Sequence, residues 1–191
     1  MITLHDVPAL AILVLCAAAA ASILIVQLRT GVPPMSSSLA EHREIVALLR
    51  RAGVAEDAVI YDLGSGWGSL VIALAAAFPN AQVRGIELSP LPYWVSRLRT
   101  RALPNVSLRH GDFLRADLSE AQAVTCYLMI KAMPTLADVL DRGLATGTPM
   151  VALSFWFRDR QTAATSNAAG LLGATALYVW PGKDFGSDAQ V

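Results

Sequence analysis

A run of three glycines and a later carboxylate are the residues of this sequence with the clearest chemistry. The run Gly-Ser-Gly-Trp-Gly at 64–68 follows the apolar residues 59–63 and precedes the helix-forming residues 70–78. Glu87 comes about twenty residues later, where an acidic residue ending a second strand can accept hydrogen bonds from two ribose hydroxyls. We therefore predict a strand, a glycine turn and a helix that together hold a nucleoside cofactor.

Two other interpretations of these residues stay open. A dinucleotide-binding turn has its third glycine at the sixth position, which is Ser69 here, so a nicotinamide-dependent reductase is the less favoured alternative. The glycines could also form only a tight loop, and Glu87 could be a solvated carboxylate at a strand end. The apolar stretch before the turn favours the cofactor interpretation, because a central parallel strand is covered on both faces.

Three segments resemble the successive cofactor motifs of class I S-adenosylmethionine-dependent methyltransferases. They are Asp62-Leu-Gly-Ser-Gly-Trp-Gly68, Gly85-Ile-Glu-Leu-Ser-Pro90 and Gly111-Asp-Phe113, and the resemblance covers residues 57–157. It implies S-adenosyl-L-methionine as the cofactor, with Asp62 near its methionine part, Glu87 at the ribose and Asp112 at the adenine amino group. The cofactor-binding residues implied in this way are Asp62, Gly64, Ser65, Gly66, Gly68, Glu87, Leu88, Asp112 and Phe113.

The expected fold class is α/β, a Rossmann-like class I methyltransferase fold with a mostly parallel sheet. Apolar strands alternate with helical stretches, which favours parallel pairing. Strands are expected at 59–63, around Val83 and Ile86, and at 106–109, 123–129, 149–155 and 174–180, with helices near 70–78, 93–101 and 135–144. The sheet of this class usually has seven strands, whereas only these six are recognised, so we expect a truncated or six-stranded version here.

The first thirty residues contain a long apolar run. Residues 7–26 are apolar apart from Ser22, and about twenty residues of helix match the roughly 30 Å hydrocarbon core of a bilayer. We predict one N-terminal transmembrane helix, in preference to a cleaved signal peptide or a buried helix. Asp6 precedes the run and Arg29 follows it, so the positive-inside rule predicts a single-pass membrane protein with its catalytic domain on the cytoplasmic side.

The chain is expected to divide into four parts. Residues 1–29 form the anchor, 30–38 a linker, 39–182 the S-adenosylmethionine-dependent methyltransferase domain and 183–191 a tail. Ser38 and Glu41 have the Ser-x-x-Glu spacing of a capping box, which predicts a helix beginning after Ser38. The linker is interpreted either as a plain connection or as a segment that folds over the mouth of the cofactor site.

A narrower resemblance concerns the acceptor of the methyl group. The apolar span, the Val-Pro segment with serines, the motif Tyr93-Trp-Val-Ser-Arg97 and the aromatic run 155–157 are similar to the small membrane-anchored protein-lysine methyltransferases, the ATP synthase c subunit lysine methyltransferase family. The resemblance implies a protein-lysine N-methyltransferase acting on a membrane or membrane-proximal protein. A lipid or small amphiphile as the acceptor, and a cofactor-binding module without catalysis, stay open as alternatives.

Composition and motifs argue against nucleic-acid and metal partners. The formal net charge is zero, and no Lys/Arg cluster is dense enough to bind phosphates. The tetrapeptide Asn/Asp-Pro-Pro-Tyr of enzymes that methylate base amines is missing after the fourth expected strand, where Tyr127 is instead our candidate for positioning the acceptor. The three histidines are scattered and both cysteines lie in apolar runs, so we expect no metal site and no disulfide.

Overall fold

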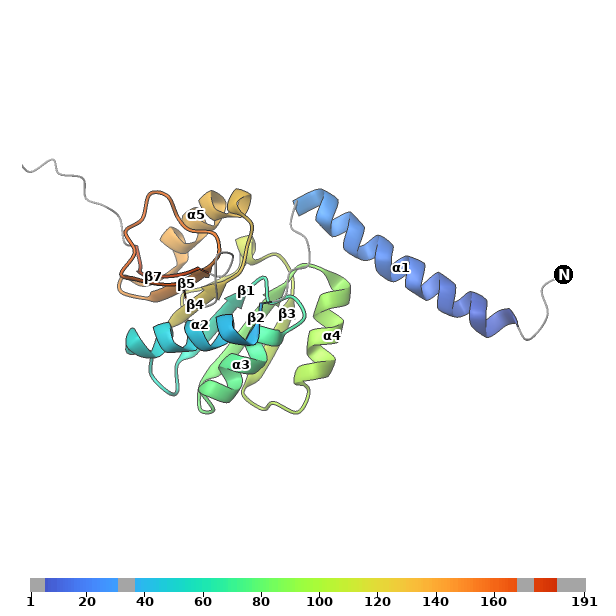
Figure 1. Cartoon of the computed structure of the whole chain (residues 1–191), viewed down its shortest axis with the longest axis horizontal. Helices are drawn as coiled ribbons and strands as arrows, with labels where there is room; N and C mark the ends of the chain where they lie inside the picture. The colour runs from blue at the N-terminus through green and yellow to red at the C-terminus, as the bar shows by residue number, and fades with distance from the viewer. Residues whose placement is uncertain (1–5, 31–36, 168–173, 182–191) are drawn as a thin grey trace, which may run out of the picture.

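The computed structural model describes residues 6–30, 37–167 and 174–181, which build an α/β domain around a twisted sheet, with one helix extending from it (Figure 1). The strands are β1 (Val59–Leu63), β2 (Gln82–Glu87), β3 (Val106–His110), β4 (Ala123–Cys126), β5 (Pro149–Leu153), β6 (Ala164–Ser166) and β7 (Thr175–Val179). Their order across the sheet is β3-β2-β1-β4-β5-β7-β6. β1 to β5 pair in parallel, whereas β7 is antiparallel to both β5 and β6. The predicted α/β fold with a mostly parallel sheet is confirmed.

The expectation of a truncated or six-stranded sheet is wrong, because the described residues form seven strands. The strand that the sequence did not reveal is β6, which has only three residues, Ala-Thr-Ser, and no apolar alternation. It exists because its backbone pairs with β7, Ala164 opposite Leu177 and Ser166 opposite Thr175. Such an edge strand depends on a partner that is distant in the sequence, so its own residues do not predict it.

Helices cover both faces of the sheet. They are α2 (Leu39–Arg51), α3 (Ser69–Ala77), α4 (Pro90–Thr100) and α5 (Met133–Gly143), with short 3-10 turns η1 (Phe113–Arg115) and η2 (Ile130–Ala132). α2 and α3 contribute to one buried apolar cluster and α5 to another, so the sheet separates two cores. Figure 1 shows α2 and α3 side by side in front of the strands. The predicted capping box starts α2, because the Ser38 hydroxyl accepts from the Glu41 N–H and the Glu41 carboxylate accepts from the Ser38 N–H.

A long N-terminal helix, α1 (Asp6–Thr30), extends away from the domain on the side of α4 (Figure 1). It leaves large apolar side chains exposed, namely Val7, Leu10, Ile12, Leu13, Val14, Leu24, Ile25 and Leu28. Among the helices of the described residues, none meets the length and hydropathy that a membrane crossing requires. The transmembrane helix within 1–29 therefore stays a prediction. The tail 183–191 and most of the linker, residues 31–36, lie outside the described residues.

Candidate active site

The glycine turn joins β1 to α3 at the carboxyl ends of the parallel strands. Gly64, Gly66 and Gly68 have φ values of 77°, 52° and 79°, a region that glycine enters without the steric cost of a Cβ. A Cβ at Gly64 would lie 2.8 Å from Leu128 Cδ2, and a Cβ at Gly68 would lie 2.8 Å from Ser96 Cβ. Glycine is therefore needed at both positions for conformation, and at Gly68 also for space, since the contact at Gly64 is only with the end of the flexible Leu128 side chain.

Glu87 ends β2 and is bonded to the glycine turn. Its Oε2 accepts from the Gly66 N–H at 2.7 Å, and its Oε1 accepts from the Ser89 N–H at 2.7 Å. Only 8% of the residue is exposed. A carboxylate has about four lone-pair positions, so two remain for further donors such as the two hydroxyls of a ribose. The structure thus brings together the glycine turn and Glu87, the two features that the sequence predicted would lie at one cofactor site.

Ser65 supplies a second indication that this turn receives a polar ligand. Its hydroxyl is buried and has no hydrogen-bond partner within the described residues. A Cβ on the neighbouring strand at Gly85 would lie 2.9 Å from Ser65 Oγ, so the turn and β2 are packed in close contact. Buried polar groups are normally satisfied by a partner, and a nucleoside cofactor with hydroxyl and charged amino-acid groups fits this turn.

Asp62 lies near the end of β1 and is almost completely buried, with 2% of the residue exposed. Its Oδ1 accepts from the Thr125 hydroxyl at 3.0 Å, across the β1–β4 pair. Burial raises the pKa of Asp62 to about 7, the bond from Thr125 opposes the rise, and the charge of Glu87 adds to it. Near neutral pH this carboxyl can therefore bind or release a proton, and a cationic group beside it would favour the ionised form.

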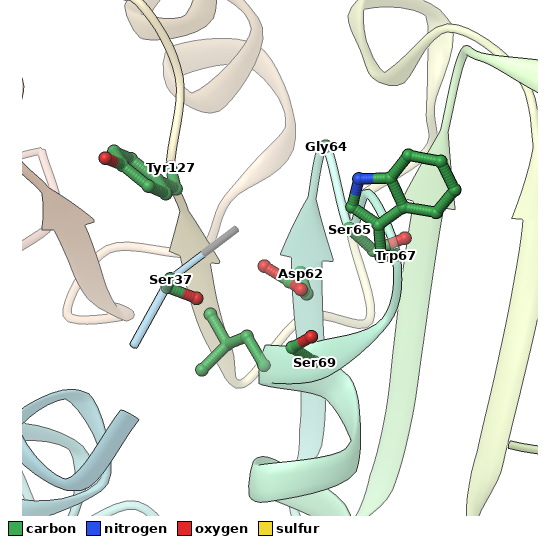
Figure 2. Close-up of a pocket in the computed structure, with 8 residues that line it drawn as sticks. Ser37, Asp62, Gly64, Ser65, Trp67, Ser69 and Tyr127 are labelled. Atoms are coloured by element: carbon green, nitrogen blue, oxygen red, sulfur yellow. The ribbon is translucent and has the colours of Figure 1, made fainter. Parts of the chain in front are cut away.

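A cavity that opens to solvent lies at this edge of the sheet, and its volume of about 330 Å³ includes part of that open solvent. Figure 2 shows Asp62 between Tyr127, which follows β4, and Trp67, which lies in the glycine turn. The residues that line the cavity are Ser37, Asp62, Gly64, Ser65, Trp67, Ser69, Leu70 and Tyr127. It has two aromatic side chains, an acid and hydroxyls, a combination that can hold a cationic group while keeping part of the site apolar.

The other predicted cofactor residues lie outside the lining of this cavity. Leu88 is 39% exposed, and its carbonyl oxygen is 2.9 Å from His110 Nε2. Asp112 caps η1, its Oδ1 accepting from the Leu114 N–H at 3.0 Å, and both Asp112 and Phe113 are half-buried. Because β2 and β3 pair through Glu87 and His110, these residues belong to the same edge of the sheet as Glu87. Their binding roles stay predictions.

Ser37, Trp67, Ser69 and Leu70 line the cavity but were not among the predicted site residues. Three of them could have been found, since they flank the last glycine of the turn. The spacing of the glycine motif does not point to Ser37, which precedes β1 by a whole helix; only the interpretation of the linker as a segment over the mouth of the site included it. The Ser37 hydroxyl lies 2.7 Å from His42 Nε2 on α2, and burial lowers the pKa of His42. Its place in the cavity supports the interpretation that the end of the linker borders the cofactor site.

The fold and the site define the class of enzyme. A crystal structure of an RNA methyltransferase from Salinibacter ruber in complex with S-adenosyl-L-homocysteine is similar to this chain, with a TM-score of 0.69 and 29% sequence identity. The alignment covers 82% of this chain and 100% of that one. Together with the glycine turn and Glu87, this likeness identifies a methyltransferase that uses S-adenosylmethionine. The predictions of enzyme class and of cofactor are confirmed.

The family can be stated more narrowly. Residues 62–164 match the ANTKMT methyltransferase domain, and the chain belongs to this family. A protein-lysine N-methyltransferase from Saccharolobus islandicus is 32% identical over 120 residues, which cover 58% of this chain and 71% of the relative. A release factor glutamine methyltransferase from Moorella thermoacetica is 33% identical over 103 residues, covering 50% of this chain and 36% of that protein. Within the described residues no group of three or more His, Cys, Asp or Glu is placed to hold a metal ion.

Proposed function

We propose that the protein transfers a methyl group to a lysine side chain of a protein substrate. The observation that carries this proposal is the similarity to a protein-lysine N-methyltransferase over 71% of that relative's length. The family match, which begins at Asp62 in the glycine motif and extends through β5, supports it. The likeness to an RNA methyltransferase supports the fold and the donor, and the neutral charge of the chain makes a phosphate-rich acceptor the weaker choice.

In this proposal the residues of the glycine turn and of the strand ends bind the methyl donor. S-adenosylmethionine supplies a methyl group bonded to a positively charged sulfur. Glu87 would accept hydrogen bonds from the ribose with the lone pairs that Gly66 and Ser89 leave free. Asp62 would lie by the charged methionine part, and Asp112 would reach the adenine amino group. Leu88 and Phe113 would border the same nucleoside.

The chain's part in the transfer is chiefly to position the reacting groups. An in-line displacement gains several kcal/mol when the nucleophile is held within near-attack distance. Tyr127 lies across the cavity from the glycine turn (Figure 2), and in this proposal its phenol would orient the acceptor amine. The amine must lose its proton before it attacks, and a partly apolar pocket favours this by destabilising the ammonium form.

We also propose that α1 holds the catalytic domain at a membrane, on the cytoplasmic side, and that the substrate is a membrane or membrane-proximal protein. Support comes from the apolar side chains that α1 leaves exposed, since soluble proteins rarely expose a long contiguous apolar surface. Sodium carbonate extraction of membranes from expressing cells tests this. Retention of the chain in the pellet is expected, and release into the supernatant would refute the anchor.

The acceptor class can be tested by label transfer. Membranes from a strain lacking the gene are incubated with the purified chain and tritiated S-adenosylmethionine, and the label is partitioned between protein and lipid. Methyl-lysine in hydrolysed protein is the expected product. Label confined to the lipid phase would replace the lysine proposal with a lipid or amphiphile acceptor, and label confined to RNA would replace it with a nucleic-acid acceptor.

A further inference from the structure

Glu44 on α2 is a buried carboxylate that the proposed reaction has not yet used. Only 9% of the residue is exposed. Its Oε2 accepts from the Thr175 hydroxyl at 2.7 Å. Its Oε1 is also buried and has no hydrogen-bond partner within the described residues. A buried polar atom without a partner costs free energy, and the cost is larger for a charged group. The fold therefore keeps an unfavourable feature at this position.

The sheet register places this carboxylate at the same edge as the cavity. Thr175 begins β7 and pairs with Leu153, the last residue of β5. β5 also pairs with β4, Ala152 opposite Cys126, so Tyr127 continues β4 at the level of Leu153. Side chains opposite one another in a sheet lie on the same face. Thr175 and Tyr127 therefore face the same side of the sheet, two strands apart at its carboxyl end.

α2 covers that side of the sheet. Its residues Ile45 and Leu49 belong to the apolar cluster against which Tyr127 packs, and Leu153 belongs to the same cluster. Glu44 lies on the same helix, with the Thr175 hydroxyl of β7 as its hydrogen-bonding partner. Glu44 therefore approaches the sheet on the face that also carries Tyr127, after β4. Asp62, on the neighbouring strand β1, lies on the same face.

We propose that Glu44 forms a cation subsite for the acceptor, receiving the ammonium group of a primary amine through its unpartnered Oε1. The proposal rests on the proposed function in that it assigns the amine of the lysine acceptor to this residue. A carboxylate and an ammonium attract strongly when both are shielded from water, and the hydrogen bond from the amine satisfies the orphan oxygen. Glu44 acts on binding of the acceptor. At the solvent-open mouth of the cavity, beside Tyr127, the ammonium gives its proton to water and becomes the neutral amine that attacks.

Glu44→Gln tests the subsite, because glutamine keeps the shape and the acceptor for Thr175 but removes the charge. The probe is n-butylammonium, with n-butanol as the neutral analogue, added to the full chain in mild detergent with S-adenosyl-L-homocysteine present. Binding is measured by thermal shift and calorimetry. We expect the wild type to bind the amine and not the alcohol, and Glu44→Gln to weaken amine binding at least tenfold while the affinity for S-adenosyl-L-homocysteine stays within twofold.

Asp138→Asn is the matched control, since Asp138 is an exposed acid of α5, on the other face of the sheet. It removes the same charge and should leave amine binding unchanged. The melting temperature of Glu44→Gln should equal or exceed that of the wild type, because an unpaired buried charge is lost, whereas a purely structural Glu44 would give a lower value. Unchanged amine binding, equal binding of amine and alcohol, or a lowered melting temperature with unchanged amine affinity would overturn the subsite.

This experiment is separate from the test of the lysine acceptor. If wild-type protein labels no lysine but still binds butylammonium through Glu44, the subsite holds and the lysine proposal fails. If lysine is labelled, and Glu44→Gln shows the same dependence of rate on acceptor concentration as the wild type, the subsite fails and the lysine proposal holds.

Discussion

Glu87 accepts a hydrogen bond from the backbone N–H of Gly66 at 2.7 Å. The bond ties the end of β2 to the turn that follows β1, so the conformation of the turn and the position of the carboxylate depend on each other. The same carboxylate accepts from Ser89 at the start of α4. It thereby joins the glycine turn to the segment that leads into α4.

Replacing Glu87 by alanine should weaken binding of S-adenosyl-L-homocysteine by about 1 to 3 kcal/mol, the range for leaving buried hydrogen-bonding groups unpaired. Calorimetric titration of the full chain measures the change. Glu56, an exposed acid in the loop before β1, provides the control, and Glu56→Ala should bind as the wild type does. An unchanged dissociation constant for Glu87→Ala would remove Glu87 from the cofactor site.

Gly68→Ala should destabilise the fold and abolish cofactor binding. Its φ of 79° is unfavourable for alanine, and its Cβ would lie 2.8 Å from Ser96 Cβ. Gly53→Ala is the matched control, because Gly53 has a φ of 76° but has nothing within 4 Å of its Cβ. Urea denaturation should show a loss of roughly 1 kcal/mol for Gly53→Ala, from the left-handed conformation alone, and a larger loss for Gly68→Ala. Equal losses would mean that the contact of the new Cβ with Ser96 on α4 does not lower the free energy of unfolding.

Asp62 should make stability depend on pH. Its pKa is raised from 3.8 to about 7 in the folded state, so between these values the folded state keeps a proton that the unfolded state has released. The free energy of unfolding therefore falls as the pH rises from about 4 to about 7, by an amount on the order of 2 to 4 kcal/mol. Asp62→Asn lacks this contribution. Urea denaturation of both proteins is measured at pH 5 and pH 8. The free energy of unfolding of Asp62→Asn relative to the wild type should be higher at pH 8 than at pH 5, and parallel pH profiles would contradict the shifted pKa.

Tyr127→Phe separates an acceptor-positioning role from a packing role. Phenylalanine keeps the ring that packs against the α2 side of the core and removes only the hydroxyl. If the hydroxyl orients the acceptor, the rate of methyl transfer should fall roughly tenfold or more, while the affinity for S-adenosyl-L-homocysteine stays the same. Transfer of tritiated methyl groups to membrane protein measures the rate. A wild-type rate would assign Tyr127 to the core alone.

Several elements were determined by residues that are close together in the sequence. β1 spans the predicted residues 59–63, the glycine turn follows it, and α3 begins at Ser69. The capping box of Ser38 and Glu41 starts α2 as expected. These features depend on backbone conformation and on short-range hydrogen bonds, which local residue types control. The link between the turn and Glu87 was also predictable, because a strand, a turn and a helix have nearly fixed lengths.

Other features exist only in the folded chain. β6 forms by pairing with β7, Ser37 reaches the cavity through the packing of α2, and the Glu44 carboxylate meets a hydroxyl 131 residues away at Thr175. The raised pKa of Asp62 likewise requires strands on both sides to exclude water. Sequence alone thus determined the local elements, the family and the donor-binding motif. Tertiary structure decided which polar groups became buried and which met a partner, because desolvation and long-range contacts arise only when distant segments pack together.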